Sequence, residues 1–118
     1  MGYFNQYTDF RDATMWHILW EFRVAPERRA EFERVYSAAG EWAALFAKSQ
    51  EFRGTTLLRD PQVAGRYVTE DVWKSAEAFE RLKEEFAAEY KRLDELCEAL
   101  TEYEMKIGGF QEVGGEER

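Results

Sequence analysis

Cysteine and histidine are almost absent from this chain of 118 residues, which contains one of each, Cys97 and His17. A single cysteine excludes an internal disulfide and a thiolate metal cluster. A single histidine leaves no histidine–carboxylate set with metal-ligand spacing, so we expect no transition metal and no tightly bound haem. Glycine-rich phosphate loops and nucleophile elbows are also missing. We therefore expect no cofactor.

Basic residues and long apolar runs are also in short supply. There are 16 basic and 24 acidic residues, which gives a net charge of −8. An acidic chain gains nothing from counterion release, so we expect neither nucleic acid nor an anionic membrane as a partner. No apolar run reaches membrane-spanning length, and no basic segment followed by an apolar run marks a signal peptide. These features favour a cytoplasmic protein.

Aromatic residues, in contrast, are plentiful: 9 Phe, 6 Tyr and 4 Trp. The length fits one domain that can bury a core without disulfides. We divide the chain into an N-terminal extension (1–14), a domain (15–113) and a polar tail (114–118). So many rings indicate a cavity or an interface built from aromatic side chains.

The central stretch is a strand that leads directly into a helix. Alternation places Tyr67, Thr69, Asp71 and Trp73 on one face of the strand. At Ser75, a suitable N-cap, the period changes from two to about 3.6. We expect one long helix over 75–100, with an apolar stripe formed by Phe79, Leu82, Phe86, Tyr90, Leu93, Cys97 and Leu100.

The other segments complete a recognisable order. We expect strands at 15–24, 52–59 and 105–113, a helical region from 26 to 49 that is interrupted at Gly40, and a short helical turn at 101–104. The resulting β-α-β-β-α-β order predicts an α+β, ferredoxin-like fold in which helices cover one face of a four-stranded antiparallel sheet. The other face would include Leu19, Leu57, Val68 and Val72. Because that face is too apolar for water, we expect a second copy to cover it.

Four segments carry a resemblance to a known family: residues 18–22 (ILWEF), 54–60 (GTTLLRD), 65–69 (GRYVT) and 72–75 (VWKS) with Phe79. Over residues 15–113 the chain resembles the antibiotic biosynthesis monooxygenase family. The resemblance implies a homodimeric α/β barrel with a pocket between sheet and helices. Members of this family include cofactor-independent oxygenases of aromatic polyketides, haem-degrading enzymes and quinol oxygenases.

The resemblance can be carried over at a few positions. Trp73 matches the tryptophan that ends the third strand and lines the pocket in family enzymes. The haem-degrading branch needs an asparagine on the first strand, near Phe22 here, and a histidine on the following helix. Residues 75–100 contain no histidine, so haem degradation is not expected. Tyr67 and Arg59 are candidate equivalents of the tyrosine and arginine used by the polyketide branch, whereas the only asparagine is Asn5.

Two functions remain open. The first is a cofactor-independent monooxygenase acting on an aromatic or quinone-like small molecule, which would itself supply the electrons. The second is a non-enzymatic dimeric barrel that binds a small ligand or serves in a stress response. An enclosed cavity with a polar group inside favours the first, and a filled core favours the second.

For the oxygenase we name catalytic and substrate-binding candidates. Trp73 is a catalytic candidate, with a purely core role as the alternative. His17 is a candidate general base. Alternatively, it is a strand histidine without a catalytic role, on the mixed polar and apolar face at or near the dimer contact. Asp71 could act as a base if desolvated, or could be solvated or paired with Arg59 or Arg66. The expected substrate-binding residues are Trp20, Phe22, Tyr67, Asp71, Phe86 and Tyr90.

Overall fold

The computed structural model describes residues 14–114. The expected N-terminal extension and polar tail therefore lie almost wholly outside the described residues. The four strands are β1 (Trp16–Arg23), β2 (Phe52–Arg59), β3 (Arg66–Trp73) and β4 (Tyr103–Gln111). The helices are α2 (Arg29–Tyr36), α3 (Glu41–Phe46), α4 (Ala76–Glu85) and α5 (Ala87–Cys97), with 3-10 turns η1 (Pro26–Arg28) and η2 (Glu98–Leu100).

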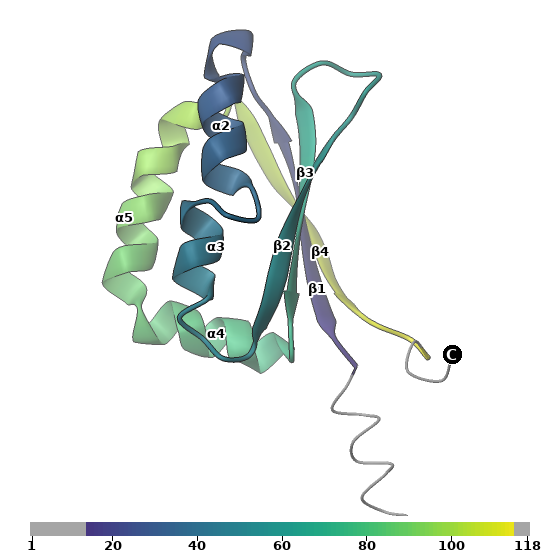
Figure 1. Ribbon diagram of the computed structural model, residues 1–118, viewed down its shortest axis with the longest axis vertical. Helices are drawn as coiled ribbons and strands as arrows, with labels where there is room; N and C mark the ends of the chain where they lie inside the picture. The colour runs from purple at the N-terminus through teal and green to yellow at the C-terminus, as the bar shows by residue number, and fades with distance from the viewer. Residues whose placement is uncertain (1–13, 115–118) are drawn as a thin grey trace, which may run out of the picture.

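The four strands form one antiparallel sheet in the order β2-β3-β1-β4. All the helices lie on one side of this sheet, and its other face is left open (Figure 1). Two split β-α-β units interleaved in this way give the ferredoxin-like arrangement. The expected α+β, four-stranded ferredoxin-like fold is confirmed.

The alternation predicted for the central strands is also confirmed. In the register of β1 and β3, Trp20 lies opposite Thr69, and Phe22 lies opposite Tyr67. Phe22, Thr69 and Tyr67 are all buried beneath the helices. Paired residues of neighbouring strands point to the same face of a sheet. Phe22, Thr69 and Tyr67 therefore all point to the helix-facing side.

Leu57 was expected on the open face, and this was wrong. It pairs with Thr69 and packs against the core, so it faces the helices. Leu58, its neighbour, pairs with Val68 on the open face and is 50 % exposed. The register of β2 shifts between Phe52 and Gly54, and such an irregularity hides the phase of a short strand from its sequence pattern.

The interruption of the first helical region at Gly40 is confirmed. Helix α2 ends at Tyr36 and α3 begins at Glu41, with Gly40 at the N-cap position. A Cβ atom on Gly40 would collide with the carbonyl oxygen of Val35, so the two helices meet closely only because this residue has no side chain.

The single long helix predicted over 75–100 was wrong. The N-cap is confirmed, since the Ser75 hydroxyl accepts a hydrogen bond from the Ala78 amide at 3.1 Å. The helix then ends at Glu85, and Phe86 adopts φ −115° and ψ 41° before α5 begins. Figure 1 shows α4 lying across the end of the sheet and α5 running back beside α3. Apolar residues at steps of three and four continue through this bend, so the pattern could not reveal it.

The helical turn expected at 101–104 was also wrong. Thr101 is extended, with φ −124° and ψ 143°, and the Glu102 amide donates to the Arg23 carbonyl at 2.8 Å. Pairing with β1 therefore outweighs the local capping-box pattern. Strand β4 starts at Tyr103, two residues before the predicted start, and ends at Gln111.

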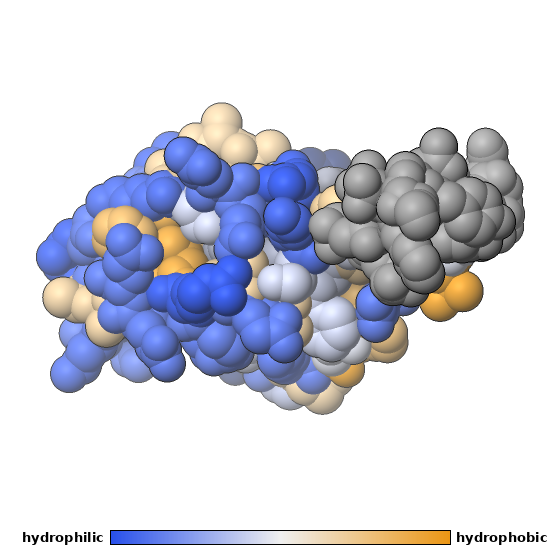
Figure 2. Space-filling model, turned by 90° about the horizontal axis from the view of Figure 1, so that it is seen from below, coloured by the Kyte–Doolittle hydropathy of each residue, from blue (hydrophilic) through white to orange (hydrophobic). Residues whose placement is uncertain are grey.

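The open face of the sheet keeps a row of exposed apolar side chains. Leu58, Tyr103, Met105 and Phe110 on this face are between 44 % and 50 % exposed. Seen from the α4 end, by contrast, the helical side is mostly hydrophilic, with apolar residues visible in a small recess and at the margins (Figure 2). Among the described residues, no helix is long and apolar enough to cross a membrane.

Candidate functional site

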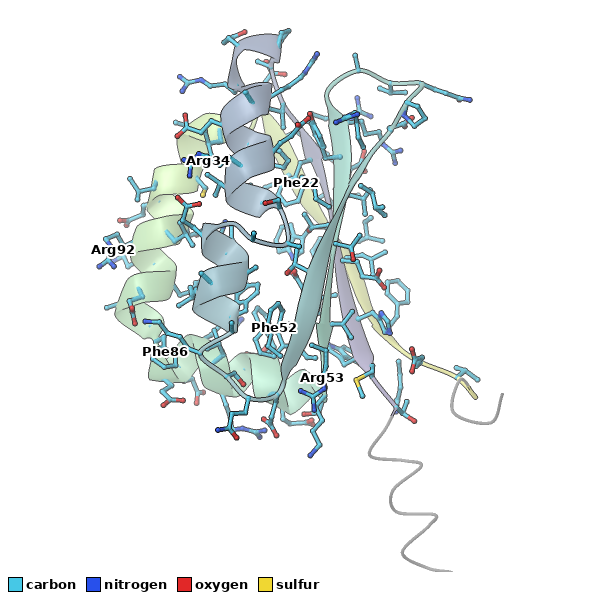
Figure 3. All side chains as sticks on the ribbon, viewed as in Figure 1. Phe22, Arg34, Phe52, Arg53, Phe86 and Arg92 are labelled. Atoms are coloured by element: carbon cyan, nitrogen blue, oxygen red, sulfur yellow. The ribbon has the colours of Figure 1, made fainter. Side chains whose placement is uncertain are left out.

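A cavity of about 190 Å³ lies between the helices and the sheet. Its walls are mostly aromatic and come from β1, α2, α3, α4 and α5. The apolar and aromatic lining residues are Ile18, Trp20, Phe22, Tyr36, Trp42, Phe46, Phe79 and Tyr90. Figure 3 shows Phe22 between the sheet and the helices that cover it. We call this space the aromatic pocket.

The sheet side of the aromatic pocket carries a polar group of three residues: Thr55, Thr69 and Asp71. Thr55 and Asp71 are register partners on β2 and β3, and the Thr55 hydroxyl donates to Asp71 Oδ1 at 2.6 Å. Both threonines are buried, at 8 % and 4 % exposure. A hydroxyl and a carboxyl therefore meet in the pocket as a hydrogen-bonded pair.

Burial dominates the electrostatics of Asp71. Loss of solvation raises the pKa of this carboxyl from 3.8 to about 6, and the negative charge of Glu70 adds to the rise. The Thr55 hydrogen bond opposes it, because it favours the charged form. Asp71 can thus change protonation state near neutral pH, which is the property required of a general base.

Tyr90 supplies a hydrogen-bond donor to the same pocket. Burial raises the pKa of Tyr90 to about 12, so its phenol stays protonated and able to donate. Trp42 lines the pocket with its ring and is only 9 % exposed. Its indole Nε1 is buried beside Tyr36 and Cys97 and meets no hydrogen-bond acceptor in good geometry among the described residues.

Two further carboxylates, Asp94 on α5 and Glu104 on β4, line the pocket from exposed positions. Burial of part of the Glu104 side chain, together with the charges of Asp94 and Glu98, raises the pKa of Glu104. The part of the pocket lining that α5 and β4 contribute is consequently acidic.

The structure brings four of the predicted substrate-binding residues to this pocket: Trp20, Phe22, Asp71 and Tyr90. They come from three separate elements, β1, β3 and α5. The alternation of the strands and the apolar stripe of the helix had placed all four on inward-facing positions.

Trp73 lies behind the pocket wall. It is 0 % exposed and does not line the cavity. Its ring packs against Phe46, Phe52 and Phe79, with ring centroids 5.0–5.3 Å apart. Because Phe46 and Phe79 do line the cavity, Trp73 supports the wall from outside. Its indole Nε1 has no hydrogen-bond partner in the described part of the chain.

The structure does not bring His17, Tyr67 or Phe86 to the aromatic pocket. His17 lies on the open face of the sheet, where Nδ1 meets Glu70 Oε2 at 2.5 Å. Tyr67 is buried against Phe32 and donates its hydroxyl to a carboxylate of α2 at 2.6 Å. Phe86 lies at the corner between α4 and α5 (Figure 3), with the Lys48 ammonium 5.1 Å from its ring centre.

Sequence reasoning did not single out Thr55, Thr69 or Trp42 as site residues. Both threonines occupy inward-facing positions of strands whose other inward residues are mostly apolar. A polar residue in the buried phase of a strand needs a hydrogen-bond partner, and this requirement is the signal that could have marked them. For Trp42 the pattern indicated only an inward-facing position on α3.

Comparisons with known proteins agree with this geometry. The profile of the family described as "Antibiotic biosynthesis monooxygenase" matches residues 15–85. No curated protein sequence matches the chain. The structure resembles SnoaB, a cofactor-independent oxygenase from Streptomyces nogalater, with 27% identity, a TM-score of 0.61, and coverage of 83% of this chain and 92% of SnoaB.

More distant structures share the fold. A candidate antibiotic biosynthesis monooxygenase from Bordetella bronchiseptica aligns with a TM-score of 0.65, 18% identity, and coverage of 84% of this chain and 97% of that one. A conserved protein from Methanosarcina mazei aligns with a TM-score of 0.66, 10% identity, and coverage of 89% and 99%. The family profile spans more than half of the chain. The chain therefore belongs to the antibiotic biosynthesis monooxygenase family.

Proposed function

We propose that this protein is a cofactor-independent monooxygenase that acts on a small aromatic molecule with an ionisable hydroxyl group, such as a hydroquinone. The observation that carries the proposal is the largely buried Asp71 in an aromatic-lined cavity, with its pKa raised to about 6. Membership of the family and the resemblance to a cofactor-independent oxygenase support it.

The proposed reaction uses the substrate as the source of electrons. Asp71 takes the proton of the substrate hydroxyl, and the resulting anion transfers one electron to O2. The substrate radical and superoxide then combine. Asp71 returns its proton to the peroxide formed in this way. The O–O bond then breaks, the outer oxygen leaves as water with the hydrogen of the attacked ring carbon, and the inner oxygen remains in the product. A hydroquinone plus O2 thus gives a hydroxyquinone plus water, and no external reductant is needed.

Chain residues other than Asp71 would orient and stabilise the reacting molecule. The ring walls hold a planar substrate, which converts a bimolecular encounter into an oriented one. The phenol of Tyr90 would donate a hydrogen bond to a developing oxyanion. The Thr55 hydroxyl fixes the carboxyl of Asp71 in one orientation.

The size of the cavity limits the substrate. About 190 Å³ is below the roughly 300–1,000 Å³ of pockets for drug-sized ligands. A substrate of one or two fused rings fits this volume better than a large polycyclic one.

The same proposal includes a homodimer formed through the open face of the sheet. Leu58, Met105 and Phe110 leave that face apolar, and an exposed contiguous apolar face is unfavourable in a monomer. We expect an interface near or above about 1,600 Å². The aromatic pocket lies on the helical side, so each protomer would keep its own site.

A second candidate function is small-ligand binding without a reaction, as in a stress-response protein. The placement of Trp73 favours it, because the residue most closely matched to the family enzymes is fully buried outside the cavity. This function requires the pocket but no base.

Oxygen consumption tests the proposal. Chelator-treated protein is mixed with a panel of one- and two-ring hydroquinones in an oxygen electrode, and the uncatalysed autoxidation rate is subtracted. We expect catalysis with at least one member of the panel and a loss of about 10²-fold or more in Asp71→Asn. Glu95→Gln, an exposed change on α5 outside the pocket, is the matched control. An equal rate in Asp71→Asn and wild type would contradict the proposal.

A further inference from the structure

Three carboxyl groups from three different elements line the aromatic pocket: Asp71 from β3, Asp94 from α5 and Glu104 from β4. No Lys, Arg or His is among its described lining residues. Asp71 lies inside and the other two lie towards solvent, so negative charge runs from the opening to the floor.

None of these carboxyl groups has a cationic partner within the described residues. Asp94 and Glu104 form neither an ion pair nor a hydrogen bond there, and Asp71 is bonded only to Thr55. Two nearby cationic side chains do not neutralise these carboxylates. Arg92 points outward from α5 (Figure 3). Lys106 lies opposite Trp20 on the helix-facing side of β4, two residues from Glu104, but it is exposed, does not line the pocket and forms no ion pair in residues 14–114.

The negative potential converges within the pocket. After burial, the charges of Asp94, Asp71 and Glu104 are the largest contributors to the raised pKa of Tyr90. The phenol of one side chain therefore feels all three carboxylates. An anionic ligand would add to this repulsion, whereas a cationic group would relieve it.

The walls suit a cation as well. Ring faces attract an ammonium group, and the attraction strengthens where water is excluded. The pocket presents Trp20, Phe22, Trp42 and Tyr90 among its rings.

The geometry favours an organic cation over a metal ion. Nowhere in the described chain do three or more His, Cys, Asp or Glu side chains come together closely enough to hold a metal. The three carboxylates share a pocket but not a coordination site. They can surround a ligand that has its own apolar body.

We propose that the aromatic pocket selects phenolic ligands that carry a protonated amine, because three unpaired carboxylates and a wall of rings surround a cavity without a cation. As a statement about the substrate, this inference rests on the proposed oxygenase function. As a statement about binding, it stands on the pocket alone.

Three probes of similar size test the effect of ligand charge on binding. Tyramine, 4-ethylphenol and 3-(4-hydroxyphenyl)propanoate share the phenol ring and differ in carrying a positive, zero or negative charge. Calorimetric titration of the full-length protein at low ionic strength should give the tightest Kd for tyramine, by roughly tenfold over 4-ethylphenol, with the anion weakest. Equal affinities, tighter binding of the anion, or no binding of any probe would overturn the inference.

Two variants test whether the preference for tyramine arises from the carboxylates of the pocket. The double change Asp94→Asn with Glu104→Gln should remove most of the advantage of tyramine over 4-ethylphenol. Glu95→Gln removes one negative charge from α5 outside the pocket and should leave the preference intact. A preference lost equally in the control would mean that net charge alone causes it, which overturns the assignment to the pocket.

The test separates this inference from the proposed function. If the tyramine preference holds and depends on Asp94 and Glu104 while no hydroquinone is oxidised, the ligand class stands and the oxygenase does not. If hydroquinones are oxidised through Asp71 but the three probes bind alike, the oxygenase stands and the ligand class does not.

Discussion

Thr55 and Asp71 face each other across β2 and β3, and the Thr55 hydroxyl donates to the Asp71 carboxyl at 2.6 Å inside the aromatic pocket. The two strands are adjacent in sequence, and the pair lies in the unbroken register that runs from Gly54 to Arg59. Two predictions about protonation follow from this single contact.

Replacement of Asp71 by Asn should stabilise the protein at neutral and alkaline pH. Burial raises the pKa of the folded-state carboxyl from 3.8 to about 6, so the folded protein resists ionising it. The wild type therefore loses stability as pH rises from about 4 through 6, whereas Asp71→Asn does not. At pH 8 the variant should be more stable by about 1–3 kcal/mol, and near pH 4 the difference should vanish. Urea unfolding at both pH values measures this, and a less stable Asn variant at pH 8 would contradict it.

Replacement of Thr55 by Val should move the pH dependence of activity. The Thr55 hydrogen bond favours the ionised carboxyl, so its loss raises the pKa of Asp71 above about 6. The rising limb of kcat/KM against pH should shift to higher pH in Thr55→Val, and Thr55→Ser should retain the wild-type limb. An unshifted or acid-shifted limb in the Val variant would show that this carboxyl is not the titrating group.

The two buried tryptophans should respond differently to the same change. Trp73→Phe should keep the fold, with a loss below about 1.5 kcal/mol, because the residue only supports the wall and its Nε1 has no partner. Its affinity for a phenolic ligand should stay within a few-fold of the wild type. Trp42→Phe replaces a lining ring by a smaller one, so affinity should fall by roughly tenfold. Thermal melting with calorimetric titration measures both, and a reversed order of the two affinities would contradict the pocket described above.

A charge on the open face should dissociate the proposed dimer. Phe110 is 49 % exposed there, and Phe110→Glu would bury a charge at the interface. Light scattering should show a dimer for the wild type and a monomer for Phe110→Glu. Leu96→Glu, at a 67 % exposed position on α5 away from that face, should remain dimeric. A wild-type monomer at micromolar concentration would contradict the dimer directly.

Alternation has a period of two, so it grouped Tyr67 with Asp71 on one face of β3 and placed Phe22 on the apolar face of β1. It did not determine which face of the sheet the helices cover. The bend at Phe86 was not, since the apolar spacing is the same in a straight and a bent helix. The phase of Leu57 depended on the register shift beside Gly54 in β2, which reverses the faces of the residues that follow it. The position of Trp73 relative to the cavity could not be predicted either. Its strand face was clear from alternation, but the sequence does not show that Phe46 and Phe79 lie between its ring and the cavity.

Labelled oxygen shows whether the atom inserted into the product comes from O2. Chelator-treated protein is allowed to turn over a hydroquinone under isotopically labelled O2, the reaction is quenched rapidly, and the product is analysed by mass spectrometry. We expect one labelled oxygen atom in each product molecule, the other in water, no effect of the chelator, and little product from Asp71→Asn. Product oxygen derived from the solvent, or full activity in Asp71→Asn, would contradict the proposed oxygenase function.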